Sequence, residues 1–430
     1  MLTQITDALN HRTDITAWQV TKVTGRSSQL FLIKHDVESV RRVDTVKYHV
    51  TVHQLRDGDG GQTLGESSFV FIEGDDIGPK LDLAAVMARG VSNQPWTLPG
   101  PGQNYVFPDV KDEAIALNPE KVIDKVKDEI FHAVDGLEGV RLSSAEVFAD
   151  CREFKIVNSL GLSASAADTE ILFDFVLLTG AGHDEVESSG FKTVRFYKDL
   201  KVRETLRQYA AYAKESLAAK LPENGRFDVV FAEEALDTLF NTFVSHAGGA
   251  SAYQGWSRFT AGSPVVADPE GELLTMYSNP QVPGGIRSGP FDENGLAYKR
   301  VEVIKDNIFR KRALSKRYSD YLGQDATGAF ANVEVETGAK TTKELLTEGC
   351  YYLLRFSTFE PNQVTGNFSG EIRTGYKVVG GRLVPVKGGS VSGVIQDAFR
   401  RAWFSSENTT RSGYRGPEAV KLMGLDIGGE

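Results

Sequence analysis

Cysteine is scarce in this chain: its 430 residues include two, Cys151 and Cys350. Two isolated cysteines with no Cys-x-x-Cys spacing do not make a disulfide framework. The opening residues Met1–Asp7 lack both the basic and the apolar segment of a secretory signal peptide. We therefore expect a reducing, cytoplasmic environment.

Long apolar runs and excess positive charge are also missing. No run approaches the roughly 20 apolar residues of a membrane-spanning helix, so we expect no membrane partner. The 48 basic and 58 acidic residues give a net charge of −10. Binding to phosphate backbones needs a basic patch. The short basic runs at 310–312 and 316–317 are more typical of a solvated face or of internal ion pairs, so we expect no nucleic-acid partner.

Glycine, in contrast, is abundant. There are 43 glycines, concentrated in the C-terminal half, and such a load is typical of many turns and of β-rich architecture. In the N-terminal half, strand-like alternation at 45–54 is followed by helical patterns. Asn118 and Pro119 are a cap and a first helical residue of the preferred types, and they begin an amphipathic helix.

A second long helix is predicted at 198–220, and the Pro- and Gly-containing segment 221–226 ends it. We place a domain boundary there. The predicted fold class is α+β. A mixed α/β N-terminal domain (1–220) is followed by a β-rich C-terminal domain (221–430), in which a short buried strand at 227–231 precedes a helix at about 234–245.

Two histidine patterns could hold a metal. His49 and His53 share one face of the predicted strand at 45–54, and His183-Asp184-Glu185 lies in a Gly-flanked loop. A solvated strand face and a solvated acidic turn are the favoured interpretations. No Gly-x-Ser-x-Gly nucleophile elbow occurs, which argues against serine hydrolase chemistry.

Several phrases resemble the TldD/PmbA family, whose second member is also called TldE. The most specific is in 365–393, where Thr-Gly-x-Phe, Gly-Tyr and Pro-Val-Lys-Gly-x-x-Val-x-Gly follow in the family's order. The Pro-Gly-Gly segment 278–295 and the strand at 301–307 also resemble the family, as do 317–323 and the Asn-Ser-Leu-Gly turn at 158–161. The resemblance covers roughly 140–400 well and the first 100 residues weakly.

This resemblance implies a dimer with a mixed α/β N-terminal domain and a β-rich C-terminal domain. It also implies two kinds of subunit. TldD-like subunits carry a His-Glu-x-x-x-His helix and a later cysteine ligand, whereas TldE-like subunits lack them. Together they cleave small or unfolded peptides, including precursors of peptide natural products.

Aligned on the strand at 227–231, the helix of this chain places Asn241, Thr242 and His246 at the three motif positions. Asparagine is a poor zinc ligand and threonine is no general base for a metal-bound water. No cysteine follows Cys350, which itself precedes the Thr-Gly-Asn-Phe motif. The resemblance therefore implies the TldE-like branch, with no metal in this chain and zinc only in a TldD-like partner.

Three functions remain open. The chain is a non-catalytic TldE-like subunit, a stand-alone metal-independent enzyme that pairs His246 with a nearby acid, or a homodimeric peptide-binding module. A peptide could add as a strand to an edge of the β-rich domain. The candidate substrate-binding residues are His246, Tyr253, Arg317 and Tyr318. Tyr253, Trp256 and Phe259 recur every three residues, which favours core packing.

Overall fold

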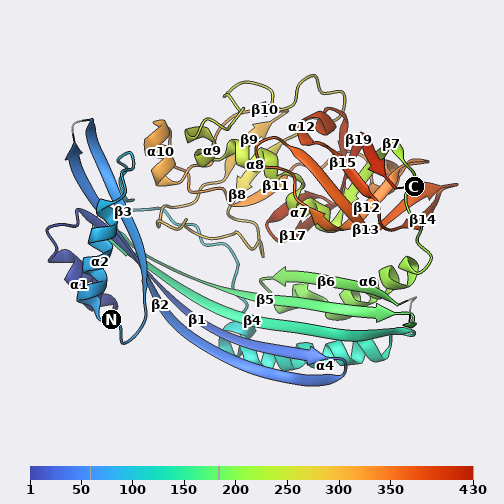
Figure 1. Cartoon of the computed structure of the whole chain (residues 1–430), viewed down its shortest axis with the longest axis horizontal. Helices are drawn as coiled ribbons and strands as arrows, with labels where there is room; N and C mark the ends of the chain where they lie inside the picture. Colours follow the sequence, from blue (N-terminus) through green and yellow to red (C-terminus); the bar gives the residue numbers. More distant parts are fainter. Residues whose placement is uncertain (59, 183–184, 430) are drawn as a thin grey trace.

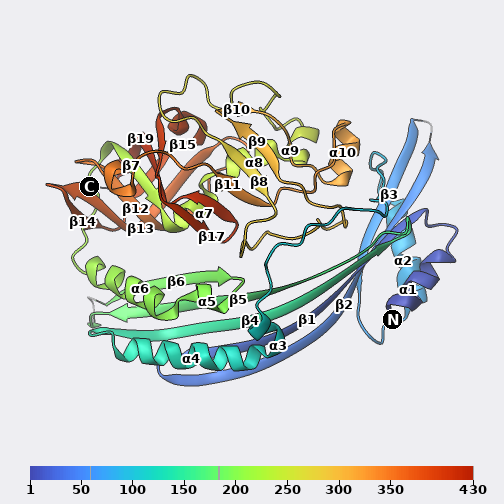
Figure 2. The same ribbon diagram turned by 180° about the vertical axis from the view of Figure 1, so that it is seen from behind.

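A long curved sheet and a β-rich C-terminal half make up the molecule (Figures 1 and 2). The computed structural model describes residues 1–58, 60–182 and 185–429. In both views the C-terminal half packs against the concave side of the curved sheet. The two termini lie at opposite ends of the molecule in Figure 1.

The curved sheet is antiparallel, with the strand order β3-β2-β1-β4-β5-β6. Its strands are β1 (Ala17–Ile33), β2 (Asp36–Gly58), β3 (Gly61–Phe71), β4 (Val140–Asn158), β5 (Ser163–Thr179) and β6 (Val186–Val194). The helices of this half are α1 (Leu2–Asn10), α2 (Ile77–Arg89), α3 (Glu113–Leu117), α4 (Pro119–Asp135), α5 (Tyr197–Leu200) and α6 (Val202–Ser216).

The two ends of the curved sheet belong to two separate hydrophobic cores. At one end, α1 and α2 cover Val20, Val50 and Val52, and at the other end α4 and α6 cover Phe173 and Leu177. The alternation predicted at 45–54 is confirmed, because Val50 and Val52 are buried on one face. Each core packs against one end of the long strands, and the strand segments between the two cores are mostly polar.

Helix α4 begins as predicted. Asn118 Oδ1 accepts a hydrogen bond from the backbone N–H of Lys121 at 2.9 Å, and Pro119 is the first helical residue. The helix predicted at 198–220 is instead two helices, α5 and α6. Lys201 separates them in the left-handed region, with φ of 49°, and a non-glycine residue there ends a helical run.

The C-terminal half contains a closed ring of five strands. The pairings run β12–β7–β19–β15–β13 and return from β13 to β12, while β14 extends the ring from β13 and β16 pairs with β19. These strands are β7 (Gly225–Ala232), β12 (Tyr351–Phe359), β13 (Asn367–Val379), β14 (Arg382–Val386), β15 (Ser390–Val394), β16 (Ala402–Phe404) and β19 (Ala419–Gly428). Closure removes the free edges of the ring strands.

A third sheet has the order β10-β9-β8-β11-β18-β17. It comprises β8 (Met276–Asn279), β9 (Val301–Lys305), β10 (Ile308–Phe309), β11 (Asn332–Val335), β17 (Asn408–Arg411) and β18 (Tyr414–Pro417). The short helices are η2 (Glu233–Ala235), α7 (Leu236–Leu239), α8 (Asn241–Ala247), α9 (Gly249–Tyr253), α10 (Lys316–Leu322), α11 (Thr342–Leu345), α12 (Ile395–Ala398) and η3 (Phe399–Arg401).

Gly380-Gly381, between two strand-like runs, is a sequence signal for a tight hairpin, and the structure confirms this prediction. These residues join β13 to β14 with φ of 58° and 70°, the two positive values that a two-residue type I′ turn requires. The predicted α+β class, with a β-rich C-terminal region, is also confirmed. We retain the division at 220/221 as a proposal.

Cys151 lies on β4 and Cys350 just before β12, and both are buried and free. Across the described ranges, no helix combines the length and the apolar character that crossing a membrane requires.

Candidate functional site

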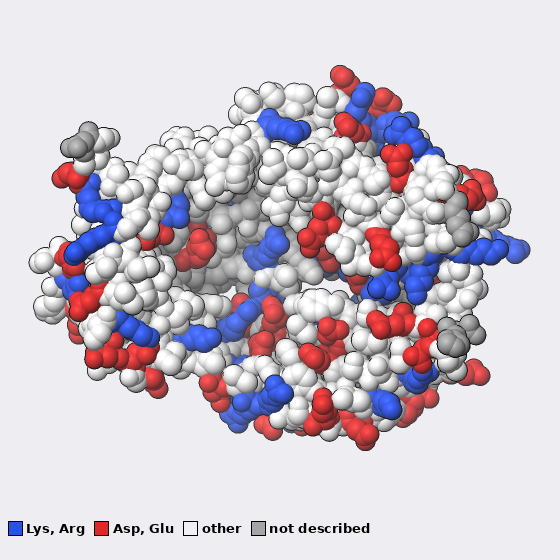
Figure 3. Space-filling model, viewed as in Figure 1, with Lys and Arg blue, Asp and Glu red and all other residues white. Residues whose placement is uncertain are grey.

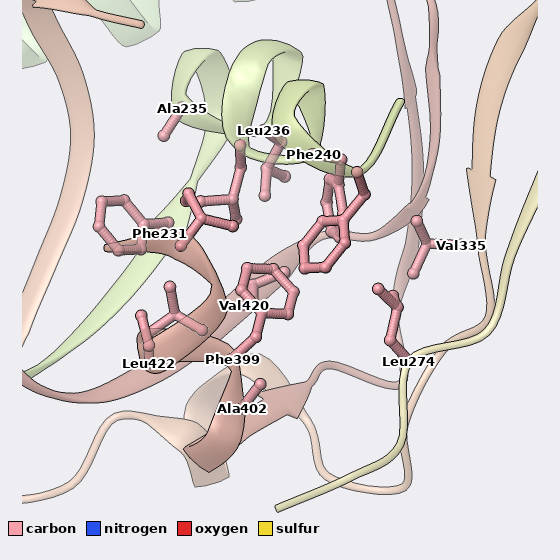
Figure 4. Close-up of a cluster of buried hydrophobic side chains, with 14 of the residues drawn as sticks. Phe231, Ala235, Leu236, Phe240, Leu274, Val335, Phe399, Ala402, Val420 and Leu422 are labelled. Carbon is pink, nitrogen blue, oxygen red and sulfur yellow. The ribbon is translucent and has the colours of Figure 1, made fainter. Parts of the chain in front are cut away.

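The segment predicted as one helix at about 234–245 is broken. The turn η2 and helix α7 lead to Phe240, where φ is −93° and ψ is 0°, and α8 begins at Asn241. Leu236 and Phe240 point into a buried apolar cluster with Phe399 (Figure 4). Because of this break, Asn241, Thr242 and His246 lie on a separate short helix, α8. Packing of the neighbouring Leu236 and Phe240 in the apolar cluster positions this helix.

Thr242 is fully buried and its hydroxyl donates to the carbonyl oxygen of Asn362 at 3.2 Å. Asn241, beside it, is half-buried. The Thr242 hydroxyl therefore ties α8 to the loop before β13 and serves as a structural contact.

His246 is 1% exposed, and its ring lies 5.2 Å from the ring of Phe259. Its Nδ1 accepts a hydrogen bond from the backbone N–H of Arg258 at 3.3 Å, while Nε2 has no partner among the described residues. Burial lowers the pKa of His246, the positive charges of Arg258 and Arg312 lower it further, and the backbone of Val364 raises it in part. The imidazole is therefore held neutral.

Arg312 contacts the main chain of His246. Its Nη1 donates to the carbonyl oxygen of His246 at 2.6 Å, and its Nη2 donates to that of Phe259 at 2.7 Å. The guanidinium is buried, and burial lowers its pKa. The His246 carbonyl lies in the last turn of α8, where a cation is favoured by the helix dipole.

The groups around His246 do not fit a zinc ion. Zinc sites in proteins use several Cys, His, Asp or Glu ligands, and here the one unpartnered nitrogen is His246 Nε2. The charged groups that act on its pKa are Arg258 and Arg312, and both would repel a dication. Among the residues that the structure describes, no three His, Cys, Asp or Glu side chains are grouped to hold a metal ion.

A cleft of about 750 Å³ lies elsewhere, between the concave face of the curved sheet and the loops of the C-terminal half. Figure 3 shows the surface hollowed between these two parts, at the left of the view. Strands β1 to β5, the loop around Trp96, the segment 288–294 and the start of α10 line it. Its volume is in the range of ordinary ligand sites.

Four side chains meet at one end of this cleft. Arg317 of α10 forms an ion pair with Glu66 of β3 and lies over the Trp96 ring, 5.1 Å from its centroid. His53 Nδ1 is 3.8 Å from Glu66 Oε2, and the His53 ring meets the Trp96 ring edge-on. The cluster connects the N-terminal sheet to a helix of the C-terminal half.

The solvated strand face predicted for His49 and His53 is wrong for His53, which is 2% exposed, whereas His49 is exposed. Trp96 packs edge-on against His53 and Arg317 lies over Trp96, and a strand pattern alone carries no sign of such a cover. Burial lowers the pKa of His53 to about 4, the nearby Glu66 charge raises it, and Arg317 lowers it.

Several buried polar atoms of the cleft residues have no hydrogen-bond partner in the described structure. They are Gln19 Oε1, His53 Nε2, Trp96 Nε1, Asp292 Oδ2 and Arg317 Nε. The set mixes donors with acceptors. Buried polar groups in native proteins are nearly always paired, so a cluster of unpaired ones points to a polar ligand.

The C-terminal half matches a known family. Residues 224–429 match the model described as the PmbA/TldA metallopeptidase C-terminal domain. A metalloprotease PmbA of Escherichia coli O157:H7 is 26% identical over 193 residues, which are 40% of this chain and 39% of that protein. A zinc metalloprotease TldD homologue of Saccharolobus solfataricus is 22% identical over 357 residues, which are 76% of this chain and 73% of that protein.

Solved structures agree over the whole chain. TldE from Thermococcus kodakarensis has a TM-score of 0.84 at 15% identity, covering 99% of this chain and 100% of that one. A protein of Bacteroides thetaiotaomicron described as a putative modulator of DNA gyrase has a TM-score of 0.84 at 16% identity, covering 100% and 98%. The C-terminal half of the chain belongs to the TldD/PmbA family, and the whole chain shares the fold of the solved TldE structure.

The candidate substrate-binding residues fall in three places. Arg317 and Tyr318 line the cleft. Tyr253 is not part of the cleft lining, and its ring lies 6.4 Å from that of Tyr318 and 4.7 Å from that of Tyr321. His246 does not line the cleft, although α8 leads through α9 to the region of α10.

The prediction of core packing is confirmed for Phe259. It is wrong for Tyr253 and Trp256, which are exposed. The helix ends at Tyr253, so the three-residue spacing does not continue one face. In the loop at 183–185, His183 and Asp184 lie outside the described residues, and Glu185 forms an ion pair with Arg141.

Sequence reasoning missed Gln19, Trp96 and Asp292 as cleft residues. Asp292 lies within 278–295, one of the phrases that resembles the TldD/PmbA family, and its Asp-Glu-Asn-Gly run is typical of a turn. Gln19 and Trp96 carry no comparable local signal, because they reach the cleft only through long-range packing.

Proposed function

We propose that this chain is the TldE-like, non-catalytic subunit of a TldD/TldE-type metalloprotease acting on small or unfolded peptides. The zinc would reside in a TldD-like partner. The observation that carries the proposal is the chemistry around His246. One neutral imidazole, a buried threonine hydroxyl that is already hydrogen-bonded, and two arginines stand where a metal site would need anionic and imidazole ligands.

The cleft supports a peptide-binding role. A peptide main chain presents alternating N–H donors and C=O acceptors, and the unpartnered atoms of the cleft are also of both kinds. Trp96 Nε1 and Arg317 Nε donate, whereas Gln19 Oε1 accepts. Such contacts read the backbone more than the side chains, which suits a complex that acts on many unfolded sequences.

The free edge of β3 offers a second mode of contact. Leu64 exchanges both of its main-chain hydrogen bonds with Asn93, on the side away from β2. Because the strand period is two, the main-chain groups of Glu66 and Ser68 also point away from β2. Both residues line the cleft, so an extended peptide could add to this edge as a strand.

The proposal places the complex in the cytoplasm. Cys151 and Cys350 are free, as is usual for thiols in a reducing compartment. The stand-alone enzyme is less well supported, since it needs an acid near His246 and the charged groups that affect the pKa of His246 are Arg258 and Arg312.

Reconstitution with a TldD-like subunit from the same genome tests the proposal. The expected result is a stable complex that hydrolyses an unfolded peptide, while this chain alone does not. Trp96→Ala in this chain should raise the KM of the complex severalfold, whereas Lys311→Ala, at an exposed ion pair with Asp325, should not change it.

Two results would contradict the proposal. One is chelator-sensitive hydrolysis by this chain alone that His246→Ala abolishes. The other is a lone chain that binds peptides but forms no complex with any TldD-like subunit of its host, which would favour the homodimeric peptide-binding module instead.

A further inference from the structure

One wall of the cleft presents hydrogen-bond acceptors without matching donors. Gln19 Nε2 donates to the carbonyl oxygen of Glu293 at 2.9 Å. This contact assigns the orientation of the Gln19 amide, because a carbonyl oxygen accepts and the nitrogen must face it. The other amide atom, Oε1, is therefore an acceptor, and it has no partner among the described residues although Gln19 is 7% exposed.

Asp292 is the second acceptor on this wall. It is 3% exposed and lines the cleft. Its Oδ1 accepts from the backbone N–H groups of Asn294 and Leu296, at 3.0 and 3.1 Å, whereas Oδ2 has no partner in the described structure. Burial raises the pKa of Asp292 to about 6, against the lowering effect of nearby backbone amides that include Ala329, so the carboxylate is ionised at neutral pH.

The charge of the cleft adds to this pattern. Four carboxylates line it, those of Glu66, Asp168, Asp292 and Glu293. Glu66 is paired with Arg317, and Asp168 Oδ1 is 2.8 Å from Arg152 Nε. In the part of the chain that the structure describes, Asp292 and Glu293 form no ion pair, so their negative charge is left for a ligand.

A ligand that matches acceptors and negative charge is a donor-only cation. Ammonium and guanidinium groups carry three to five N–H donors and no acceptor. We propose that Gln19, Asp292 and Glu293 form a subsite for a cationic group of a bound peptide. The inference rests on the proposed peptide-binding function and narrows it to peptides with a suitably placed lysine, arginine or free N-terminal amine.

An inorganic divalent ion fits this subsite less well. Calcium takes six to eight oxygen ligands and magnesium demands an octahedral set. Here the cleft offers Gln19 Oε1, one oxygen of Asp292 and the exposed carboxylate of Glu293. An organic cation needs only two or three acceptors on one side.

The test measures binding of four labelled peptides of identical length to the intact protein. One is neutral and N-acetylated, one adds a central lysine, one adds a central glutamate, and one has the neutral sequence with a free N-terminus. The expected order of affinity places the lysine or the free-amine peptide about tenfold above the neutral one, as for a charge-assisted hydrogen bond. The peptide that shows the higher affinity identifies whether the cation is a lysine side chain or the N-terminal amine.

Asp292→Asn keeps the Oδ1 acceptor of the turn, removes the charge and replaces the Oδ2 acceptor with an N–H donor, so it should abolish this preference. Glu293→Gln alters an exposed side chain, so it is a second variant with no risk to folding, and it should reduce the preference. Asp128→Asn, at an exposed site on α4, is the matched control and should leave the preference unchanged. Equal affinities for all four peptides, or a preference that survives Asp292→Asn, would overturn the subsite.

n-Butylammonium, measured by NMR line shifts with and without Asp292→Asn, separates this inference from the function beneath it. Amine binding that depends on Asp292 without any peptide binding would retain the subsite and refute the peptide role. Peptide binding with no charge preference and no amine binding would retain the peptide role and refute the subsite. Calcium binding that depends on Asp292, in the absence of amine binding, would also overturn the proposed ligand.

Discussion

Arg312 Nη1 donates a hydrogen bond to the carbonyl oxygen of His246, 2.6 Å away. The only histidine of the degenerate motif thus sits against a permanent cation that has no acidic partner within the described structure. The same guanidinium also bonds the carbonyl oxygen of Phe259 and approaches the hydroxyl of Ser257. A hydrogen bond from Arg312 therefore stabilises the end of α8.

Arg312→Met should destabilise the protein by about 2–4 kcal/mol, because it leaves two buried carbonyl oxygens without their charge-assisted donor. Urea unfolding would measure the change. Arg310→Met, at the exposed neighbouring arginine, is the control and should shift the midpoint little. A loss at Arg312 no larger than the control would show that solvent replaces those hydrogen bonds.

His53 should make stability fall in mild acid. Its pKa in the folded protein is about 4, below the ordinary 6.5, because the buried ring resists charging. Between pH 4 and 6.5 the folded state therefore binds fewer protons than the unfolded state. The free energy of unfolding is unaffected by this group above pH 6.5 and decreases as the pH falls toward 4. This decrease amounts to at most roughly 3 kcal/mol. His53→Gln should flatten this slope in urea unfolding between pH 4 and 6.5, and an unchanged slope would contradict the assignment.

Asp292 should have the opposite sign. Burial raises its pKa from 3.8 to about 6, so the folded state holds a proton that the unfolded state has released. Stability from this group falls as the pH rises from about 4 to 6, and the cost persists at pH 7. Asp292→Asn should therefore raise the free energy of unfolding at pH 7 by about 1–3 kcal/mol, while removing cation binding. A loss of stability at pH 7 would indicate that Oδ2 already has a partner.

Arg317 should hold the two halves together at the cleft. It pairs with Glu66, and Asp320 of the same helix accepts from the backbone N–H of Thr97 at 2.9 Å. Arg317→Gln should cost about 1 kcal/mol, since the pair is partly exposed. It should also speed amide hydrogen exchange in 93–98, measured by mass spectrometry. Lys311→Gln, at the exposed ion pair with Asp325, is the control and should leave exchange in 93–98 unchanged.

The elements with strong local signals were predictable. The Asn118 cap, the alternation at 45–54 and the Gly380-Gly381 turn each depend on residues close in sequence. The long strands were not. The β-branched and aromatic runs at 15–23 and 29–33 indicate two separate strands in the sequence. They are parts of the single strand β1, because Arg26 between them pairs with both Asp44 of β2 and Cys151 of β4. Cross-strand pairing on both sides overrides the polar composition of that stretch.

The candidate site was predictable only where the family motif marks it. Asn241, Thr242 and His246 were found from their place after a short strand, and their surroundings were not. Arg258 and Arg312 approach His246 from 12 and 66 residues away. His53 was misjudged for the same reason, because Trp96 and Arg317 cover it from distant parts of the chain.

Metal content tests the central claim most directly. The intact chain, purified from zinc-supplied cells, would be compared with His246→Ala by elemental analysis and native mass spectrometry. We expect substoichiometric zinc in both, because His246 offers one nitrogen beside two arginines. One tightly bound zinc per chain in the wild type, lost in His246→Ala, would contradict the account.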